Sequence, residues 1–309
     1  MEIQWSPSDS NLWADFHRQH DGSLQQAWDY GAALADLGIQ VHRALLRHAD
    51  GTPAALAQFI CRRMALYLQL ASCSRGPVWS PQLDAAACAQ ALRQLRKTLP
   101  VGAVRVPLFS FEATAEQLAP AQTQGMSRVM TGYSTVMLDI TQNEPALRAQ
   151  LEGKWRNRLV KALAQPRLQV HAAASHSRLQ WLLEREQQQR QTRHFGGLPA
   201  SFVQAYVARG GKSRPNFVVG WAEHGRQTVA AMLFLLHGAR ATYHIGWADD
   251  EGRELNAHNA VLWTSLPVLR SQDVRTLDLG GVNTRDLAGI SRFKLGTGGK
   301  VLTLAGTYF

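Results

Sequence analysis

The sequence predicts an α/β (α+β) fold built from two tandem copies of one unit, each a mixed sheet flanked by helices. Strand-type and helix-type stretches alternate along the chain. The order strand, turn, long strand, strand, glycine-containing loop, helix, strand occurs twice, at an offset on the order of 170 residues. An apolar fraction of 45% in 309 residues is enough for two cores. We therefore expect one domain over 1–135 and a second over 136–309.

The first domain begins with helical spacing in two pieces from Trp5 to Asp36, because Leu12, Trp13 and Phe16 share one face. Beyond it we expect strands over 41–46, 54–61, 66–71 and 104–109, and an amphipathic helix over 84–99.

The second domain begins with a helix over 141–164. Thr141 and Glu144 have the spacing of a capping box, and leucines recur every four residues. Lys154, Arg158 and Lys161 share another face, as a phosphate-contacting ridge or as a solvated surface. The elements expected next are strands over 168–172, 217–222, 228–236, 241–247 and 276–279, and helices over 178–193, 202–207 and 256–269.

The C-terminal stretch from Thr276 carries the strongest local signal. Asp278 lies at a strand end before Gly280-Gly281, and Phe293-Lys294 lies between glycine-rich turns. A lone cation among bare backbone turns suits an anionic or carbonyl-bearing ligand. A β-hairpin with a solvated lysine fits the pattern equally well.

Positive charge is concentrated in the second part of the chain. Residues 1–140 hold 11 Lys+Arg and 11 Asp+Glu, whereas residues 141–309 hold 22 and 12. Such an asymmetry favours an anionic partner for the second domain, with nucleic acid or a phosphate-rich cofactor foremost; the alternative is a merely basic surface.

Several classes of protein are disfavoured by motif and composition. Cys61, Cys73 and Cys88 have no metal-ligand spacing and suggest buried thiols in a reducing compartment. The histidines are scattered, and there is neither a Walker loop nor a GxSxG motif. The polar N-terminus and the short apolar runs predict no signal peptide and no membrane span. We expect a cytoplasmic protein without a metal site.

Five segments, taken in order, support a family resemblance. They are LQQAW, RGPVW, STVMLDI with LRAQLEGKWRNRLVKAL, YHIGWADDEGRELNAHNAVLWTSL, and LDLGGVN with GISRFKLGTGGK. This set resembles the Fem-type non-ribosomal aminoacyl transferases, which share a superfamily with the GNAT acyltransferases. The resemblance covers nearly the whole chain and implies two tandem GNAT-like domains. It implies an amine acceptor held mainly by the first domain and an acyl donor held mainly by the second.

The resemblance also implies roles for individual residues. Lys294 would meet the tRNA 3′ end and the transferred acyl group, with Phe293 shaping the wall beside it. The ridge residues Lys154, Arg158 and Lys161 would contact donor phosphates. Further residues expected at the substrates are Arg193, Phe195, Tyr243, Asn283 and Arg292.

Two departures from the family pattern bear on the acceptor. The lysine that family members binding nucleotide-linked muropeptides carry after the LQxxxW-like element is absent after Trp28, which weakens the case for a peptidoglycan precursor. The long charged helical arm of some members is missing too. The chain also lacks a clear pyrophosphate loop of the CoA-dependent kind.

The chemistry of amide formation assigns the remaining roles. It needs an aligned neutral amine, a stabilised carbonyl oxygen and a protonated leaving group. Lys294 is the candidate for stabilising the oxyanion or the leaving ribose-phosphate region. Asp278 is a base, a group that orients the amine, or a cap of the Gly280-Gly281 turn.

These observations lead to three hypotheses for the function. The leading one is an aminoacyl-tRNA-dependent aminoacyltransferase that forms an amide on a small molecule or peptide and holds no permanent cofactor. The first alternative is an N-acyltransferase that uses acyl-CoA or an acyl-carrier protein. The second is a non-catalytic binding module that keeps the fold.

Overall fold

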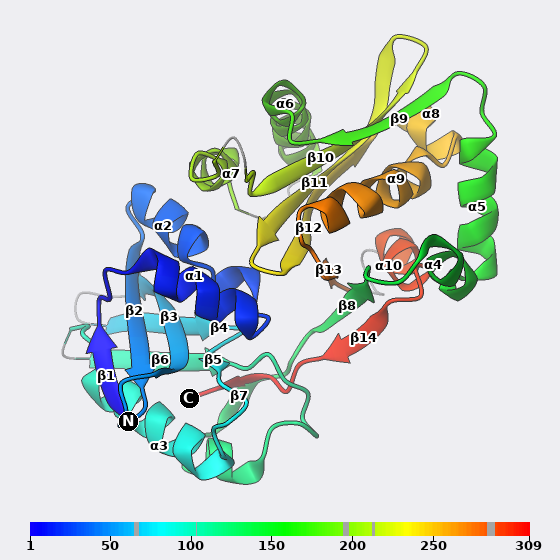
Figure 1. Ribbon diagram of the computed structural model, residues 1–309. Coiled ribbons are helices and arrows are strands. Elements are labelled where there is room, and N and C mark those ends of the chain that lie inside the picture. Colours follow the sequence, from blue (N-terminus) through cyan, green and yellow to red (C-terminus); the bar gives the residue numbers. More distant parts are fainter. Residues whose placement is uncertain (65–67, 103, 194–197, 212–213, 283–287) are drawn as a thin grey trace. The chain divides into compact units, whose positions relative to one another are not determined.

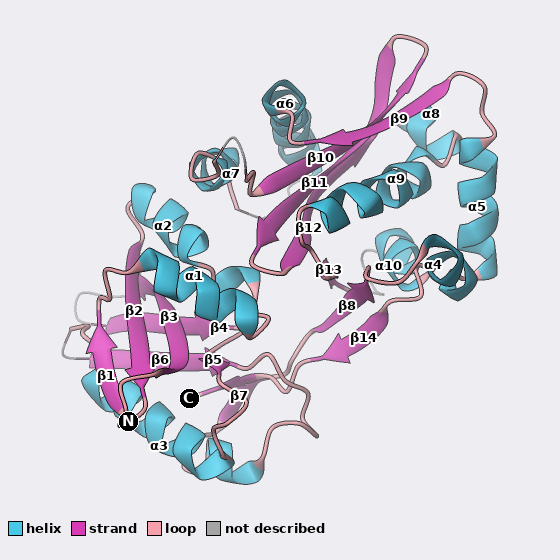
Figure 2. Cartoon of the chain, in the orientation of Figure 1, coloured by secondary structure: helices cyan, strands magenta, loops and turns pink. Residues whose placement is uncertain are grey.

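The computed structural model describes residues 1–64, 68–102, 104–193, 198–211, 214–282 and 288–309. The chain divides into two compact units (Figure 1). Unit 1 comprises Met1–Ser134 with Leu302–Phe309, and unit 2 comprises Thr135–Val301. Each unit is a mixed sheet with helices packed on it, so the mixed α/β fold expected from the sequence is confirmed (Figure 2). No helix in the described part of the chain is long and apolar enough to cross a membrane.

Unit 1 is organised around a sheet with the strand order β1-β2-β3-β4-β6-β15-β7, with β5 added to β3. Its elements are β1 (Glu2–Trp5), α1 (Ser10–Gln19), η1 (Leu24–Gln26), α2 (Trp28–Asp36), β2 (Gln40–Arg47), β3 (Pro53–Arg63), β4 (Leu68–Ser74), β5 (Val78–Trp79), α3 (Ala85–Thr98), β6 (Val104–Ser110), η2 (Pro120–Thr123), β7 (Arg128–Met130) and β15 (Thr307–Tyr308).

The unit 1 sheet is buried on both faces. Ala44 and Leu46 of β2 point into the cluster that contains Leu92 of α3, whereas Leu45 between them packs with Trp13 of α1. Side chains of a strand alternate between faces, so strands covered on both sides must be apolar throughout. This explains why β3 is apolar from Pro53 to Cys61 with the one exception of the buried Gln58.

Unit 2 has the sheet order β14-β8-β13-β12-β11-β10-β9. Its elements are β8 (Ser134–Asp139), α4 (Glu144–Gln150), α5 (Gly153–Leu163), β9 (Leu168–Ala173), α6 (His176–Arg193), α7 (Ala200–Val207), β10 (Phe217–His224), β11 (Gln227–His237), β12 (Arg240–Ala248), α8 (Asp250–Glu254), α9 (Ala257–Ser271), β13 (Thr276–Gly281), α10 (Ala288–Leu295) and β14 (Lys300–Thr303).

The core of unit 2 lies between the sheet and the helices α9 and α5. Met232 and Phe234 of β11 join Val261 of α9 and Trp155 of α5 in one cluster. Helix α6 packs against the strands β10, β11 and β12. The three strands expected over 217–222, 228–236 and 241–247 are confirmed, and they form the antiparallel meander β10-β11-β12.

Two helix predictions in the sequence were wrong in detail. Trp5 pairs with Ala44 in a strand, and the first helix starts later because the Asp9 carboxylate accepts from the N–H groups of Asn11 and Leu12. The helix expected over 141–164 is broken into α4 and α5. Its cap is Asn143, since Thr141 bonds to Asp139 instead.

The end of the chain also differs from the prediction. Residues 302–309 were assigned to the second domain, but β15 pairs with β6 and β7 and so completes the sheet of unit 1. The Phe293-Lys294 step was expected in a loop between two glycine-rich turns, whereas it lies in helix α10. This helix places the lysine against the end of β13.

Candidate functional site

The candidate site lies where two parallel strands of unit 2 separate. β12 and β13 pair only from Arg240 opposite Thr276 to Thr242 opposite Asp278. Beyond this point β12 continues to Ala248 while β13 turns at Gly280, whose φ is +78°. We call this divergence the fork: β12 beyond Thr242 and β13 beyond Asp278. A strand edge that leaves its ladder exposes backbone groups that a ligand can bind.

Unit 1 has no equivalent opening among its described residues. Its own parallel pair, β4 and β6, stays in register for the full length of both strands, from Leu68 opposite Val104 to Ser74 opposite Ser110. The two units thus share an architecture but differ at the position where unit 2 forms the fork.

Asp278 anchors the base of the fork. Its Oδ1 accepts a hydrogen bond from the Thr135 hydroxyl at 2.6 Å and another from the Gly280 N–H at 2.8 Å. The side chain is only 2% exposed. The bond from the Gly280 N–H is the one expected if Asp278 caps the turn, which is one of the roles that the sequence left open. It fixes the backbone of Gly280.

Lys294 reaches into the fork from α10. Its Nζ donates to the Gly281 carbonyl at 2.8 Å and lies 5.9 Å from the centre of the Tyr243 ring. A Cβ on Gly280 would stand 3.4 Å from the same Nζ. An ammonium has three N–H donors, and within the described residues this bond to Gly281 uses one of them.

Two opposing effects act on the pKa of Lys294, and the lowering by burial is the larger one. Burial lowers the pKa of Lys294, because a charged group loses hydration, and the nearby Asp278 carboxylate opposes that shift. The residue is 9% exposed, so it is not the solvated loop lysine that one interpretation of the sequence allowed. A partly dehydrated ammonium interacts strongly with any oxyanion that approaches it.

Phe293 and Trp155 join α10 to α5. The Trp155 indole donates to the Phe293 carbonyl at 3.0 Å, and the two rings are 5.9 Å apart. The Glu152 N–H, just before α5, donates to the Gly296 carbonyl just after α10. These bonds hold the helix that carries Lys294 in place.

The basic ridge on α5 is exposed to solvent. Lys154, Arg158 and Lys161 all lie on the outer surface of this helix, next to the exposed apolar residues Val160 and Leu163. The structure contains no ligand, so their contact with donor phosphates stays a prediction. Seven residues of helix spread the ridge over about 10 Å.

The other predicted substrate residues fall in different places. Tyr243 is at the fork, where burial raises the pKa of its hydroxyl, and Arg292 is exposed on α10. Phe195 and Asn283 lie outside the described residues, as does the side chain of Arg193. His244 occupies a bulge in β12, and burial, helped by the charge of Arg190, lowers its pKa to about 4, so it is neutral near pH 7.

Two of the sequence segments singled out above prove to be structural in unit 1. Gln26, from LQQAW, donates to the carbonyl oxygens of Gln58 and Ser74 and accepts from the Gln58 N–H, so it links η1 to β3 and β4. Trp28 lies under the Arg43 guanidinium, 3.9 Å from the ring centre. RGPVW contains the buried Arg75, which is ion-paired with Glu112.

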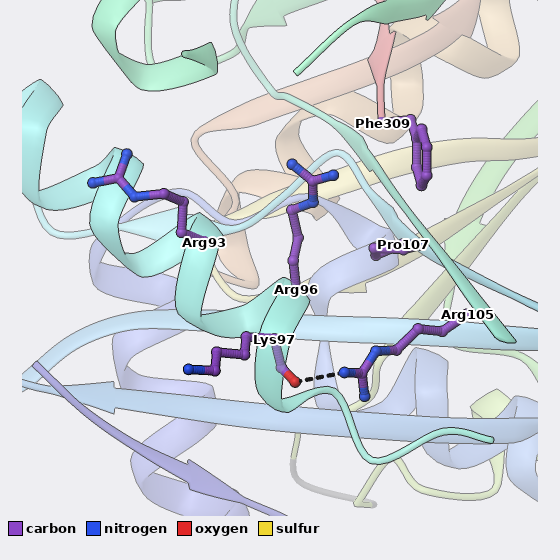
Figure 3. Close-up of a pocket in the computed structure, with 6 residues that line it drawn as sticks. All are labelled: Arg93, Arg96, Lys97, Arg105, Pro107 and Phe309. Carbon is purple, nitrogen blue, oxygen red and sulfur yellow. Dashed lines mark hydrogen bonds between the residues drawn. The ribbon is translucent and has the colours of Figure 1, made fainter. Parts of the chain in front are cut away.

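A basic pocket of about 330 Å³ lies beside α3 in unit 1 (Figure 3). Four cations line it: Arg93, Arg96, Lys97 and Arg105. Arg105 donates to the Lys97 and Leu99 carbonyls at the end of α3, and the Arg93 side chain points away from Arg105. Arg105 therefore caps the C-terminal end of α3.

Within the described residues there is no cluster of His, Cys, Asp or Glu suited to a metal ion.

One protein-family model matches the part of the chain that holds the candidate site. Residues 149–295 match the family model described as the acetyltransferase (GNAT) domain. No curated protein matches the chain. The segment that matches this family model contains the fork, α10 and Lys294.

Solved structures resemble the chain over its whole length. A structure titled FemX aligns with a TM-score of 0.84 at 14% identity, covering 100% of this chain and 96% of the other. The C-terminal domain of a putative lysylphosphatidylglycerol synthetase from Agrobacterium fabrum aligns at 0.58 and 13%, covering 97% and 90%. A tandem GNAT protein from the clavulanic acid biosynthesis pathway aligns at 0.52 and 13%, covering 99% and 98%.

Fold and family model point in the same direction. The chain has the fold seen in FemX and in a tandem GNAT protein, and residues 149–295 in its second unit match the GNAT family model. These findings support an acyltransferase.

Proposed function

We propose that the protein is an aminoacyl-tRNA-dependent aminoacyltransferase that forms an amide bond on an amine of a small molecule or peptide. The observation that carries the proposal is the position of Lys294. Its ammonium lies in the fork, held by the Gly281 carbonyl and close to Gly280 and Tyr243. The FemX fold and the excess of cations after residue 140 support a donor carried on a polyanion.

In this mechanism the ester carbonyl of the aminoacyl group enters the fork. The acceptor amine attacks as its neutral form, and negative charge develops on the carbonyl oxygen. The Lys294 ammonium stabilises that charge through an N–H not used by Gly281, while Asp278 keeps the turn at Gly280 in place. The new C–N bond forms and the amine nitrogen gives up a proton, while the C–O bond to the tRNA ribose breaks and the ribose oxygen takes up a proton to become a hydroxyl.

The basic ridge on α5 contributes binding of the donor. Lys154, Arg158 and Lys161 stand on the helix that is fixed to α10 through Trp155. Because the helix itself is held in place, only these side chains have to become ordered when they contact phosphates. The acceptor is assigned to unit 1 and the location to the cytoplasm, where charged tRNA is available.

An N-acyltransferase that uses acyl-CoA or an acyl-carrier protein is the second candidate. The GNAT family model over residues 149–295 favours it. In this case the fork would receive a thioester, and the leaving group would be a thiol.

A paired assay separates the two donors. Purified protein is given amine acceptors with aminoacyl-tRNA, with and without RNase pretreatment, and in parallel with acyl-CoA under a thiol-release readout. We expect product that depends on intact RNA and no thiol release. Transfer that is indifferent to RNase, or thiol release that depends on the acceptor, would reject the tRNA-dependent function in favour of the thioester donor.

A further inference from the structure

A second groove lies in unit 2, away from the fork, where α6 crosses the ends of β11 and β12. One pocket of about 540 Å³ is lined by Arg178, Trp181, Arg185, Arg226, Gln227, Thr228, Trp247 and Asp249. A second pocket of about 280 Å³ shares Arg185, Trp247 and Asp249 with the first. The two pockets therefore form one elongated depression, which we call the tryptophan groove.

Tryptophan rings and an arginine guanidinium group lie close together in this groove. Trp181 and Trp247 meet edge to face with ring centres 5.1 Å apart, and both are only half-buried. The Arg185 guanidinium lies 5.6 Å from the centre of the Trp181 ring. Unpaired nucleobases stack on such aromatic rings and on arginine planes, whereas the bases of a duplex have their faces covered.

The charge in the groove is available to an anion. Arg178 is ion-paired with Glu223, but within the described residues neither Arg185 nor Arg226 has a carboxylate partner. The Asp249 carboxylate is already engaged, since Oδ1 accepts from the Gly252 N–H and Oδ2 from the Gln227 amide. Two exposed guanidiniums beside two tryptophans match the phosphates and bases of a nucleic acid strand.

We propose that the tryptophan groove binds single-stranded nucleic acid. Identifying that strand as the unpaired end of a tRNA rests on the proposed function. Strand β12 borders both places: Tyr243 faces Lys294 at the fork, and Trp247 lines the groove four residues later. These positions are about 13 Å apart along β12, and the bulge at His244 turns the two side chains to opposite faces of the sheet, so a strand bound in the groove has to pass the free edge of β12 to reach the fork.

The test uses a labelled six-nucleotide single-stranded RNA and fluorescence anisotropy. The Arg185→Gln/Arg226→Gln protein removes two exposed charges from the groove. The control, Arg148→Gln/Arg214→Gln, removes two arginine charges elsewhere in unit 2, where Arg148 is ion-paired with Glu144 and Arg214 with Asp273. We expect the groove variant to bind roughly ten-fold more weakly and its salt slope to fall by about 1.4, while the control stays near wild type.

A stacking variant tests the aromatic part separately. Trp181→Leu is expected to weaken binding of the same RNA and to reduce the quenching of tryptophan fluorescence that RNA causes. Equal affinity of wild type and groove variant, equal losses in groove variant and control, or equally tight binding of the corresponding RNA duplex would each overturn the proposal.

This experiment and the donor assay fail independently. The oligonucleotide carries no amino acid, so its binding is measured whatever donor the enzyme uses. Loss of the groove proposal leaves the tRNA-dependent transfer standing, and transfer indifferent to RNase leaves RNA binding in the groove standing.

Discussion

Lys294 shows how much of a residue's environment a sequence pattern leaves open. The Phe-Lys pair between glycines indicated a cation at a backbone gap, and the structure places that cation at the fork. The sequence could not show that the ammonium is buried, because burial depends on α10 packing against α5 and β13. Whether Lys294 and Asp278 act in catalysis stays a prediction.

Lys294→Met is expected to lower kcat roughly 10²–10³-fold while leaving the fold intact. The substitution removes the ammonium but keeps an unbranched side chain of similar length in the same buried space. Steady-state kinetics and urea denaturation at pH 7 measure both effects. Unchanged kcat would show that the ammonium does not meet the reacting carbonyl.

The same variant gives a pH dependence with a defined sign. Because burial lowers the pKa of Lys294, the unfolded chain binds more protons than the folded one between that lowered pKa and the usual value of 10.5. The free energy of unfolding of the wild type should therefore rise with pH in this window relative to Lys294→Met. Denaturation series from pH 7 to 10.5 check this, and a constant difference between the two proteins would contradict it.

Thr135→Val is expected to destabilise unit 2 by about 1–3 kcal/mol, since it leaves the buried Asp278 carboxylate short of one hydrogen bond. Thr141→Val is the matched control, because its hydroxyl makes a similar 2.6 Å bond to Asp139 at an exposed site. The control should lose less than about 0.5 kcal/mol. Equal losses in the two variants, measured by urea denaturation, would show that burial of Asp278 does not matter.

At the scale of elements, the fork depends on how β13 ends. The sequence predicted the strand and the glycine turn correctly, because β-type alternation and Gly280-Gly281 are local signals. It did not predict α10, since its eight residues have glycines near both ends and a weak apolar pattern. The contact of Thr135 with Asp278 was also beyond prediction: the partners are 143 residues apart and meet only through the pairing of β8 with β13.

Gly280→Ala separates backbone strain from damage to the site. Gly280 and Gly38 have nearly the same positive φ, +78° and +77°, so alanine at either position should cost about 1–2 kcal/mol of stability. A Cβ at Gly38 meets nothing within 4 Å, whereas one at Gly280 stands 3.4 Å from the Lys294 Nζ.

We therefore expect a fall in kcat from Gly280→Ala and none from Gly38→Ala at similar thermal shifts. Measured kcat and melting temperature of the two variants decide the matter. A parallel loss of activity in both would indicate a general effect of destabilisation and leave the fork without a role.

At the scale of the whole molecule, the duplicated mixed α/β architecture was predictable because it repeats one local pattern twice. The assignment of the last residues was not. Pairing of β15 with β6 and β7 joins segments nearly 200 residues apart, and no local pattern encodes that register. The polypeptide leaves unit 1 after Ser134 and returns to it at Leu302, so unit 1 is closed by residues from both ends of the chain.

Deletion of residues 304–309 is expected to destabilise unit 1 and spare unit 2. The deletion removes β15 and the side chains of Leu304 and Ala305, which are 4% and 2% exposed, but keeps β14 up to Thr303. Burial of the leucine alone stabilises by about 2 kcal/mol, and the hydrogen bonds from Leu304 to Tyr133 and from Ala305 to Ala113 are lost as well.

Hydrogen exchange resolved by peptide locates the effect of that deletion. Peptides from β6 and β7 should lose protection, whereas peptides from β10, β11 and β12 should keep it, because opening free energies differ between cooperative units. Thr307→Val in the full-length chain is the milder control: it removes only the 2.7 Å hydroxyl contact with Ser110 and keeps the strand. Loss of protection in β10–β12 after the deletion would mean that β15 supports unit 2 as well and would contradict two units that open independently.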